Sequence, residues 1–272
     1  VMGTQSRADV TGEIYGTDYP TDEEFAVYAV QHNGDLTTWN AATGFWTNNK
    51  ATPITVTKEG NGWEEENGTD YYWPKASDEN VKLSFAAYSP AELPTGATAS
   101  YGTAGLTITD FTVNNNVSEQ IDLMFSDRTL NQTEADNATD GVSINFNHAL
   151  SSIVFSAVEN DAKAGYQITG ITIQGDFVTK ATFNETVTDG STYVYSVGGT
   201  SNTAVPAWSN PTTTTGQKYT PSFTAYTVTG TTTEFTGGND AGQAKTAILT
   251  IPQTIPNNAK VTITYVYTPN NG

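Results

Sequence analysis

Short apolar runs that alternate with polar residues recur along this chain, and they constrain its fold more than any other feature. Residues 81–85 are typical, because Val81, Leu83 and Phe85 alternate with Lys82 and Ser84. A period of two places every second side chain on the same face of a β-strand. Similar runs occupy residues 106–108, 142–146, 153–155, 168–173, 193–197, 223–228, 247–251 and 261–267, with Gly, Asn and Pro clusters between them. Short strands between turn signals are typical of sandwiches and barrels rather than of α/β folds.

Residues 25–30 differ from the other runs, because Phe25, Val27 and Ala29 alternate with residues that are also apolar. This predicts a strand with two apolar faces. Helical signals are scarce, since no window of about 12 residues or more carries a 3.6-residue apolar stripe. Residues 119–123 and 133–138 could each form a single helical turn. The sequence therefore predicts an all-β fold.

The length of 272 residues exceeds the roughly 100–200 residues of one ordinary domain, which favours two domains over one large sandwich. Residues 129–141 read as a polar loop, and the alternating run at 142–146 closes what precedes it. A new series of strands begins at Ile153 after a short polar junction at 148–152. We therefore predict an N-terminal β-sandwich over residues 1–149 and a C-terminal one over residues 150–272. The stretch 198–216, rich in Thr, Gly and Asn, is predicted to be a long loop inside the second.

The charge balance excludes several classes of partner. With 29 acidic and 11 basic residues, the formal net charge is −18. A nucleic acid or an anionic lipid surface would be repelled, so neither is an expected partner. The absence of cysteine excludes disulfides, thiol catalysis, thiolate zinc sites and iron–sulfur clusters. No cofactor is expected, and no run approaches the ~20 apolar residues of a membrane span.

Candidate catalytic residues are few. The two histidines are His32, in a turn-like QHNGD string, and His148, after an alternating strand. Neither lies near a sequence signal for an activated nucleophile. The acidic runs 22–24 and 64–66 read as solvated loops rather than the paired carboxylates of a glycosidase. We predict no enzyme activity, and a hydrogen-bonded structural role for His148.

Two further patterns leave a binding role open. The loop from Asp136 to Asp140 resembles part of a calcium loop but lacks its alternating ligands and its terminal Glu. Aromatic residues are concentrated in the first third of the chain, where they favour core packing but could form a saccharide platform. They are Trp39, Phe45, Trp46, Trp63, Tyr71, Tyr72 and Trp73.

Specific strings give a resemblance to a known family. They are YYWP at 71–74, LSFAAYSP at 83–90, DLMF at 122–125, VSINFNHALSSIVF at 142–155, GYQITGITI at 165–173 and IPQT at 251–254. In this order and spacing the chain resembles the fimbrillin family, pilus subunits and associated surface lipoproteins of Bacteroidales, over residues from about 10 to 270.

The resemblance implies two tandem transthyretin-like β-sandwich domains and export as a lipoprotein. The lipidated cysteine is absent here, so we expect it to precede Val1 in the precursor. The resemblance also implies assembly by donor-strand exchange, in which an arginine-specific protease removes an N-terminal strand and a neighbour's strand fills the groove. Arg7, in a polar segment, is the candidate cleavage point, and Arg128 is an alternative.

The C-terminal run matches a strand of this kind. A strand over 261–267 would direct Val261, Ile263, Tyr265 and Tyr267 to one face, as a donor strand or a strand that closes its own domain must. The function predicted is therefore a structural or adhesive subunit of a pilus at the outer-membrane surface. Its partners would be other pilus subunits, with a host glycan or protein as a further ligand. The alternative is a surface glycan-binding lipoprotein of a polysaccharide-uptake system.

Overall fold

The computed structural model describes residues 19, 24–36, 43–44, 52–59, 62–65, 70–74, 80–102, 105–138, 141–159, 164–185, 207–222, 224–231, 233–234 and 247–269. Antiparallel β-sheet dominates these residues, which confirms the all-β prediction. Two helical turns interrupt it, the 3-10 helix η2 (Val117–Glu119) and α1 (Glu134–Asn137). No described helix is long and apolar enough to cross a membrane.

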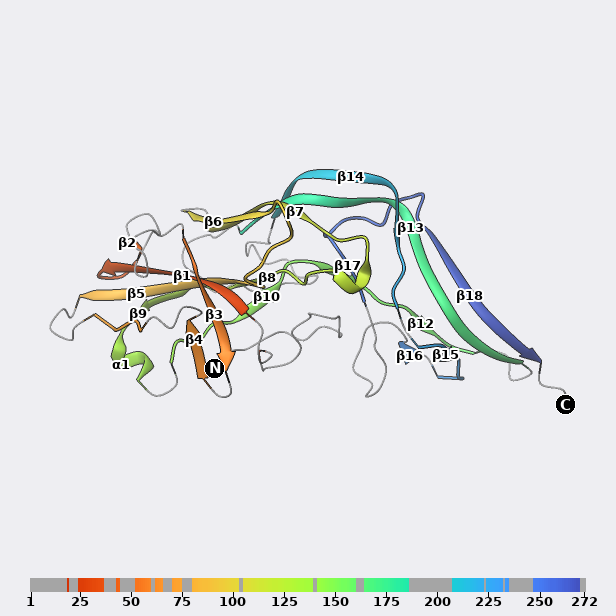
Figure 1. Cartoon of the computed structure of the whole chain (residues 1–272), viewed down its shortest axis with the longest axis horizontal. Coiled ribbons are helices and arrows are strands. Elements are labelled where there is room, and N and C mark those ends of the chain that lie inside the picture. The colour runs from red at the N-terminus through yellow and green to blue at the C-terminus, as the bar shows by residue number, and fades with distance from the viewer. Residues whose placement is uncertain are drawn as a thin grey trace, which may run out of the picture.

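Eight strands form the larger sheet, called sheet A. They are β1 (Glu24–Asn33), β2 (Thr43–Gly44), β3 (Ile54–Glu59), β4 (Gly62–Glu65), β5 (Val81–Ser89), β8 (Met124–Ser126), β9 (Thr129–Gln132) and β10 (Phe146–His148). The main order is β10-β8-β5-β1-β3-β4, with β2 beside β1 and β9 beside β5. Figure 1 shows β1 and β5 side by side in one half of the molecule.

Six strands form sheet B. They are β6 (Thr98–Gly102), β7 (Gly105–Thr112), β13 (Ala164–Asn184), β14 (Ala207–Tyr219), β15 (Tyr226–Thr227) and β18 (Lys260–Pro269). The order is β14-β13-β7-β6, and β15 and β18 also pair with β13. Two small sheets complete the set. They pair β11 (Ser151–Ile153) with β17 (Ile248–Thr250), and β12 (Ser156–Ala157) with β16 (Thr233–Glu234).

The predicted two-sided strand is β1, and both of its faces are buried. Phe25, Val27 and Ala29 pack into one apolar cluster with residues of β5 and β10. Tyr28 and Val30, on the opposite face, join the cluster between sheet A and sheet B. Sheet A is therefore a central layer, which explains why β1 is apolar at consecutive positions.

β13 is 21 residues long and changes partner along one edge. Its first half, from Ala164 to Gln174, pairs with β18, and its last residues, from Lys180 to Asn184, pair with β7. β14 runs along the opposite edge from Ile173 onward. In Figure 1 β13 first runs beside β18, then bends and continues beside β14.

Side chains fill the gap where β13 has left β18 and not yet reached β7. The Val178 N–H donates to Gln253 Oε1 at 2.7 Å, and Gln253 Nε2 donates back to the Val178 carbonyl at 3.0 Å. This amide reproduces what a neighbouring strand would supply. Gly175 lies at a register shift of the same strand, where an added Cβ would meet Ala259 Cα at 3.0 Å.

The predicted junction at residue 149 is buried. Ala149 and Leu150 are each 1% exposed, and Trp208 Nε1 donates to the Ala149 carbonyl at 3.1 Å. The apolar cluster between the sheets takes residues from both sides of this position, among them Tyr28 and Phe183. The two halves of the sequence also share sheet B, which contains β7 and β13. The division into two tandem domains at residue 149 stays a prediction.

Some predicted boundaries are wrong. Residues 207–216, expected in a loop, belong to β14. This stretch contains four consecutive threonines, whose β-branched side chains favour extended backbone, and its exposed position leaves no apolar alternation to reveal it. β10 covers Phe146–His148 and β11 covers Ser151–Ile153, so each shares a single residue with the strand predicted at 142–146 or 153–155. The run at 193–197 lies outside the described residues.

Candidate functional site

β18 is exposed along its whole length, and it carries the four residues singled out in the sequence. Val261 and Ile263 are each 49% exposed, Tyr265 is 56% exposed and Tyr267 is 52% exposed. These four side chains, here called the β18 surface, alternate with Thr262, Thr264, Val266 and Thr268 and so share one face. A row of large apolar side chains that is half in water is unusual in a strand this long.

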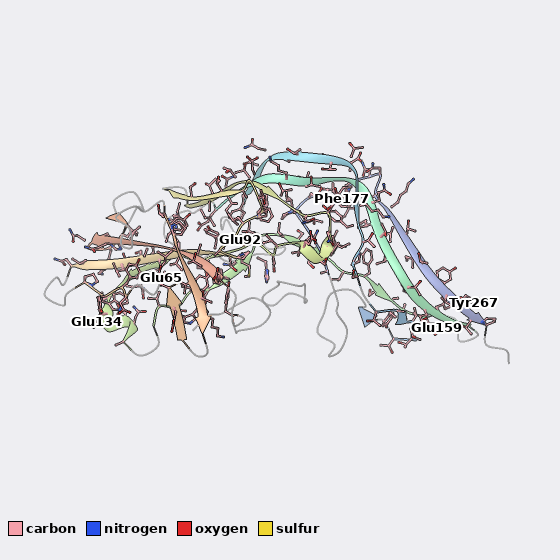
Figure 2. All side chains as sticks on the ribbon, in the orientation of Figure 1. Glu65, Glu92, Glu134, Glu159, Phe177 and Tyr267 are labelled. Carbon is pink, nitrogen blue, oxygen red and sulfur yellow. The ribbon has the colours of Figure 1, made fainter. Side chains whose placement is uncertain are left out.

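The register with β13 explains the exposure. The β18 surface lies beside apolar residues of β13 in four cross-strand pairs, namely Tyr166–Tyr267, Ile168–Tyr265, Ile171–Ile263 and Ile173–Val261. The isoleucines of β13 are at most 6% exposed. The layer that covers this face therefore spans β13 and stops short of β18. Figure 2 shows Tyr267 at the end of the molecule, well beyond Phe177 on β13.

An apolar groove lies where the cover ends. It has a volume of about 420 Å³ and is lined by Ala157, Val158, Glu159, Tyr166, Ile168, Val228, Ile263 and Tyr265. The Tyr166 ring touches two tyrosines of the β18 surface, with centroid distances of 6.0 Å to Tyr265 and 5.4 Å to Tyr267. Full burial of such a side chain is worth about 1.5–3 kcal/mol, so covering the exposed half would contribute roughly 1 kcal/mol each.

The outer edge of β18 is open within the part of the chain that the structure describes, where β18 pairs with β13 alone. An open edge presents backbone N–H and C=O groups to any extended segment that approaches. Strand addition supplies backbone hydrogen bonds, and pockets for alternate side chains supply selectivity. The β18 surface offers both features together.

Of the two candidate cleavage points, Arg7 and Arg128, the structure describes Arg128. Arg7 lies outside the described residues. Arg128 has a side chain only 10% exposed, and its Nε donates to the Tyr101 hydroxyl at 2.7 Å. The same Nε lies 3.9 Å from Glu185 Oε1, and burial raises the pKa of Tyr101 well above its usual value. A protease could not reach Arg128 in this folded state.

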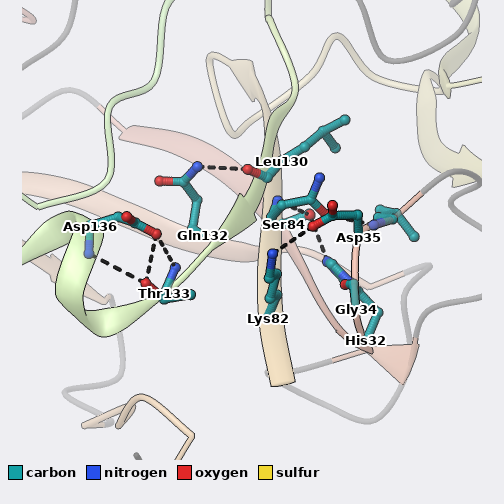
Figure 3. Close-up of polar contacts among 11 residues, drawn as sticks. His32, Gly34, Asp35, Lys82, Ser84, Leu130, Gln132, Thr133 and Asp136 are labelled. Carbon is teal, nitrogen blue, oxygen red and sulfur yellow. Dashed lines mark hydrogen bonds and ion pairs between the residues drawn. The ribbon is translucent and has the colours of Figure 1, made fainter. Parts of the chain in front are cut away.

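His32 makes a hydrogen bond to a serine that the sequence did not indicate (Figure 3). Its Nε2 lies 2.8 Å from Ser84 Oγ, and its Nδ1 lies 2.8 Å from the Gly34 carbonyl. A carbonyl only accepts, so Nδ1 carries the proton and Nε2 accepts from the Ser84 hydroxyl. Ser84 is fully buried, and Ser84 Oγ also accepts from the Asn131 N–H at 2.9 Å. Burial lowers the pKa of His32, and the group works as a cross-strand link between β1 and β5.

His148 is also buried. Its Nδ1 lies 2.7 Å from Asp122 Oδ2, with both side chains at most 5% exposed. The pair connects the end of β10 to the residue two positions before β8, next to the junction at 149. This gives His148 a structural place in the fold.

The remaining candidates from the sequence are used in local structure. Asp136 completes the capping box of α1, whose N-cap is Thr133, because Asp136 Oδ2 accepts from the Thr133 hydroxyl at 2.6 Å and from the Thr133 N–H at 3.2 Å (Figure 3). Asp140 lies outside the described residues, among which no group of three potential ligands could hold a metal ion.

The aromatic residues of the first third do not form one exposed row in the part that the structure describes. Tyr71 and Trp73 pack against the cluster below sheet A. Trp63, 42% exposed, touches Phe25 edge-on at 5.3 Å, and Tyr72 is 78% exposed. Trp39, Phe45 and Trp46 lie outside the described residues. Of the four described aromatics, two pack against the core and two are exposed, and the glycan-platform alternative stays a prediction.

Glu185 and Gln120 make buried hydrogen bonds that could not be predicted from the sequence. Glu185, 2% exposed, follows β13 directly and accepts from the Leu106 N–H of β7 at 2.6 Å. Gln120 holds β17 by both of its amide atoms, because Leu249 N–H donates to Oε1 at 2.7 Å and Nε2 donates to the Leu249 carbonyl at 3.2 Å. An isolated acid or amide in a polar segment gives no sequence signal that distinguishes it from a solvated residue.

Comparison with known proteins places the chain. No curated protein matches it. Among solved structures, a candidate cell adhesion protein from Bacteroides uniformis aligns over 94% of this chain and 78% of its own, with 16% identity and a TM-score of 0.45. The family model described as fimbrillin-like matches residues 7–272, and the chain therefore belongs to the fimbrillin-like family.

Proposed function

We propose that this protein is a structural or adhesive subunit of a cell-surface pilus, and that it joins neighbouring subunits by strand exchange at the β18 surface. One observation carries the proposal, namely a ten-residue strand whose apolar side chains stay half exposed and whose outer edge is open in the described chain. Membership of the fimbrillin-like family supports the pilus assignment. The proposed location is the outer-membrane surface, through a lipid anchor on the precursor.

In strand exchange, a segment of one subunit completes a sheet of the next. β18 suits this because, in the described chain, it is attached along one edge only and its side chains are about half exposed. The alternative is that β18 simply closes its own half of the protein. The two differ in whether the β18 surface controls association between molecules.

Two double variants on opposite faces of β18 test the proposal. Ile263→Lys with Tyr265→Lys places charge in the apolar row, whereas Thr262→Lys with Thr264→Lys adds the same charge to the other face and is the matched control. Each protein is treated with an arginine-specific protease and run on an unboiled gel. We expect ladders from the wild type and the threonine variant, and none from the apolar-face variant.

The starting molecules should have equal thermal melting temperatures, because all four positions are exposed. If both variants form the same ladders as the wild type, the β18 surface is not the contact. Arg7→Ala tests the cleavage step, since it should remove the ladders if trimming at Arg7 releases the acceptor. Ladders that persist in Arg7→Ala would exclude that step alone.

The proposal also includes the absence of catalysis. The Ser–His contact of Ser84 with His32 is buried, so a substrate could not reach Ser84 Oγ without unfolding of β1 or β5. Incubation with polysaccharide and peptide substrates should give no turnover. Turnover that disappears in Ser84→Ala, His32→Ala or His148→Ala would contradict the proposal.

A further inference from the structure

A second groove, far more polar than that at β18, lies between the ends of the two large sheets. It has a volume of about 840 Å³, within the ~300–1,000 Å³ typical of sites for small molecules. Sheet A contributes Glu24 at the start of β1 and the turn at 90–95 after β5. Sheet B and the segment after β7 supply the facing wall, including Thr179 and Gln217. Figure 2 shows Glu92 of the turn in the middle of the molecule.

The walls are fixed by hydrogen bonds that do not involve a ligand. The Ala91 N–H donates to the Glu24 carbonyl at 3.0 Å, and the Val113 N–H donates to the Thr179 carbonyl at 2.8 Å. The hydroxyls of Thr179 and Thr214 lie 2.6 Å apart. A groove held open in this way costs little ordering free energy when a ligand enters.

Neutral polar residues are the largest class in the lining, ahead of the apolar and the acidic ones. Hydroxyls and amides come from Thr95, Thr112, Thr214, Asn114, Asn115 and Gln217. Such groups can both donate and accept. Apolar side chains also line the groove, namely Pro90, Ala91, Leu93, Pro94, Val113 and Ile121.

The charged residues of the lining are acidic. Glu24 Oε1 accepts from the Thr57 hydroxyl at 3.4 Å, and Glu119 Oε2 accepts from the Asn114 amide at 3.0 Å. Glu92 is exposed at the rim. The described lining contains no Lys, Arg or His, and the chain as a whole has a net charge of −18. The negative electrostatic potential of the groove and of the whole chain would therefore repel an anionic ligand.

We infer that this groove binds a neutral saccharide. A sugar carries many hydroxyls that each need a donor or an acceptor, and the hydroxyl, amide and carboxylate groups supply both. The apolar wall suits the C–H face of a sugar ring. A basic peptide is the competing occupant, because it would favour the three carboxylates, but the Thr, Asn and Gln side chains of the lining outnumber these carboxylates.

The test uses the monomeric full chain, so it is independent of strand exchange. The labelled protein is applied to a printed array of neutral, sialylated and sulfated oligosaccharides, and the strongest neutral ligand is titrated by calorimetry. We expect binding to neutral saccharides only. The double variant Asn115→Ala with Gln217→Ala should weaken it by about tenfold or more, as expected for the loss of two hydrogen bonds.

Gln167→Ala, an exposed glutamine on β13 beside β18, is the matched control and should bind as the wild type does. Equal melting temperatures would show that all variants fold. The inference is overturned if no neutral saccharide binds, if sialylated or sulfated glycans are preferred, or if a Lys- and Arg-rich peptide binds instead. Binding that survives unchanged in the double variant would also overturn it.

Discussion

Glu185 Oε2 accepts a hydrogen bond from the Leu106 N–H at 2.6 Å, and this contact ties the residue after β13 to the second residue of β7. The carboxylate is nearly fully buried and also lies 3.9 Å from Arg128 Nε. A buried charge that loses its partner is strongly destabilising. The stability of the fold therefore depends on this contact between β7, in the first half of the sequence, and the residue that follows β13, in the second.

Removal of this carboxylate should destabilise the whole fold. We expect Glu185→Ala to lower the free energy of unfolding in urea by about 3 kcal/mol or more, because it removes the buried carboxylate that lies 3.9 Å from Arg128 Nε and that accepts from the Leu106 N–H. Glu185→Gln keeps an acceptor for Leu106 and should cost less. Glu134→Ala, at an exposed acid of α1, is the control, and equal stability of Glu185→Ala and Glu134→Ala would contradict this account.

A glycine can be required by a positive φ or by lack of space for a Cβ, and Gly96 and Gly105 allow these two effects to be compared. Both have positive φ, +101° and +91°, but an added Cβ at Gly105 would lie 2.8 Å from the Glu185 carbonyl oxygen, whereas nothing lies within 4 Å of one at Gly96. Gly96→Ala should cost only the conformational term of about 1–2 kcal/mol. Gly105→Ala should cost a further ~1–3 kcal/mol from overpacking. Thermal denaturation of both variants tests this, and similar losses would show that the close approach to Glu185 is unimportant.

Stability should fall in mild acid because of His32. Burial lowers its pKa in the folded state, so below about pH 6.5 the unfolded chain takes up a proton that the folded chain refuses. The contribution of His32 is constant above that pH and declines as the pH falls toward the lowered pKa. It then levels off.

The difference in unfolding free energy between the wild type and His32→Asn isolates this effect, because asparagine does not titrate. The wild type should lose stability relative to the variant by at most about 1.4 kcal/mol per pH unit below pH 6.5. A difference in unfolding free energy that stays the same between about pH 8 and about pH 5 would contradict the assignment of a neutral, buried His32.

The two halves should remain together when the chain is divided at the predicted boundary. The pairing of β7 with β13, and the bond from Trp208 Nε1 to the Ala149 carbonyl, cross this position. We expect fragments 1–149 and 150–272, when co-expressed, to elute as one complex in size-exclusion chromatography. Phe183→Asp in the second fragment should weaken the complex, because Phe183 is buried between the sheets. Fragments that fold and elute separately would instead support two independent domains.

The sequence was most informative where burial follows a simple rule. The two apolar faces of β1 and the alternation of β18 could both be predicted, because each depends on side chains within one strand. The length of β13 could not, since a bulge at Gly175 interrupts the alternation while the strand continues. Nor could the contacts of Glu185 and Gln253, which join residues 75 or more positions apart. The exposure of the β18 surface is likewise invisible in sequence, because an apolar row reads the same whether or not another layer covers it.

β14 and β18, the two long strands that pair with β13, differ in the regularity of their backbones. β14 contains Pro211, which has no N–H to donate, and two further residues of this strand, Asn210 and Gly216, have positive φ values of +52° and +66°. Irregularities of this kind block the approach of another strand. β18 carries no such break between Lys260 and Thr268. If sheet B grows by strand addition past β14 or β18, as proposed, it would grow outward from β18 only, and an assembly of molecules with one receptive side would have a distinct front and back.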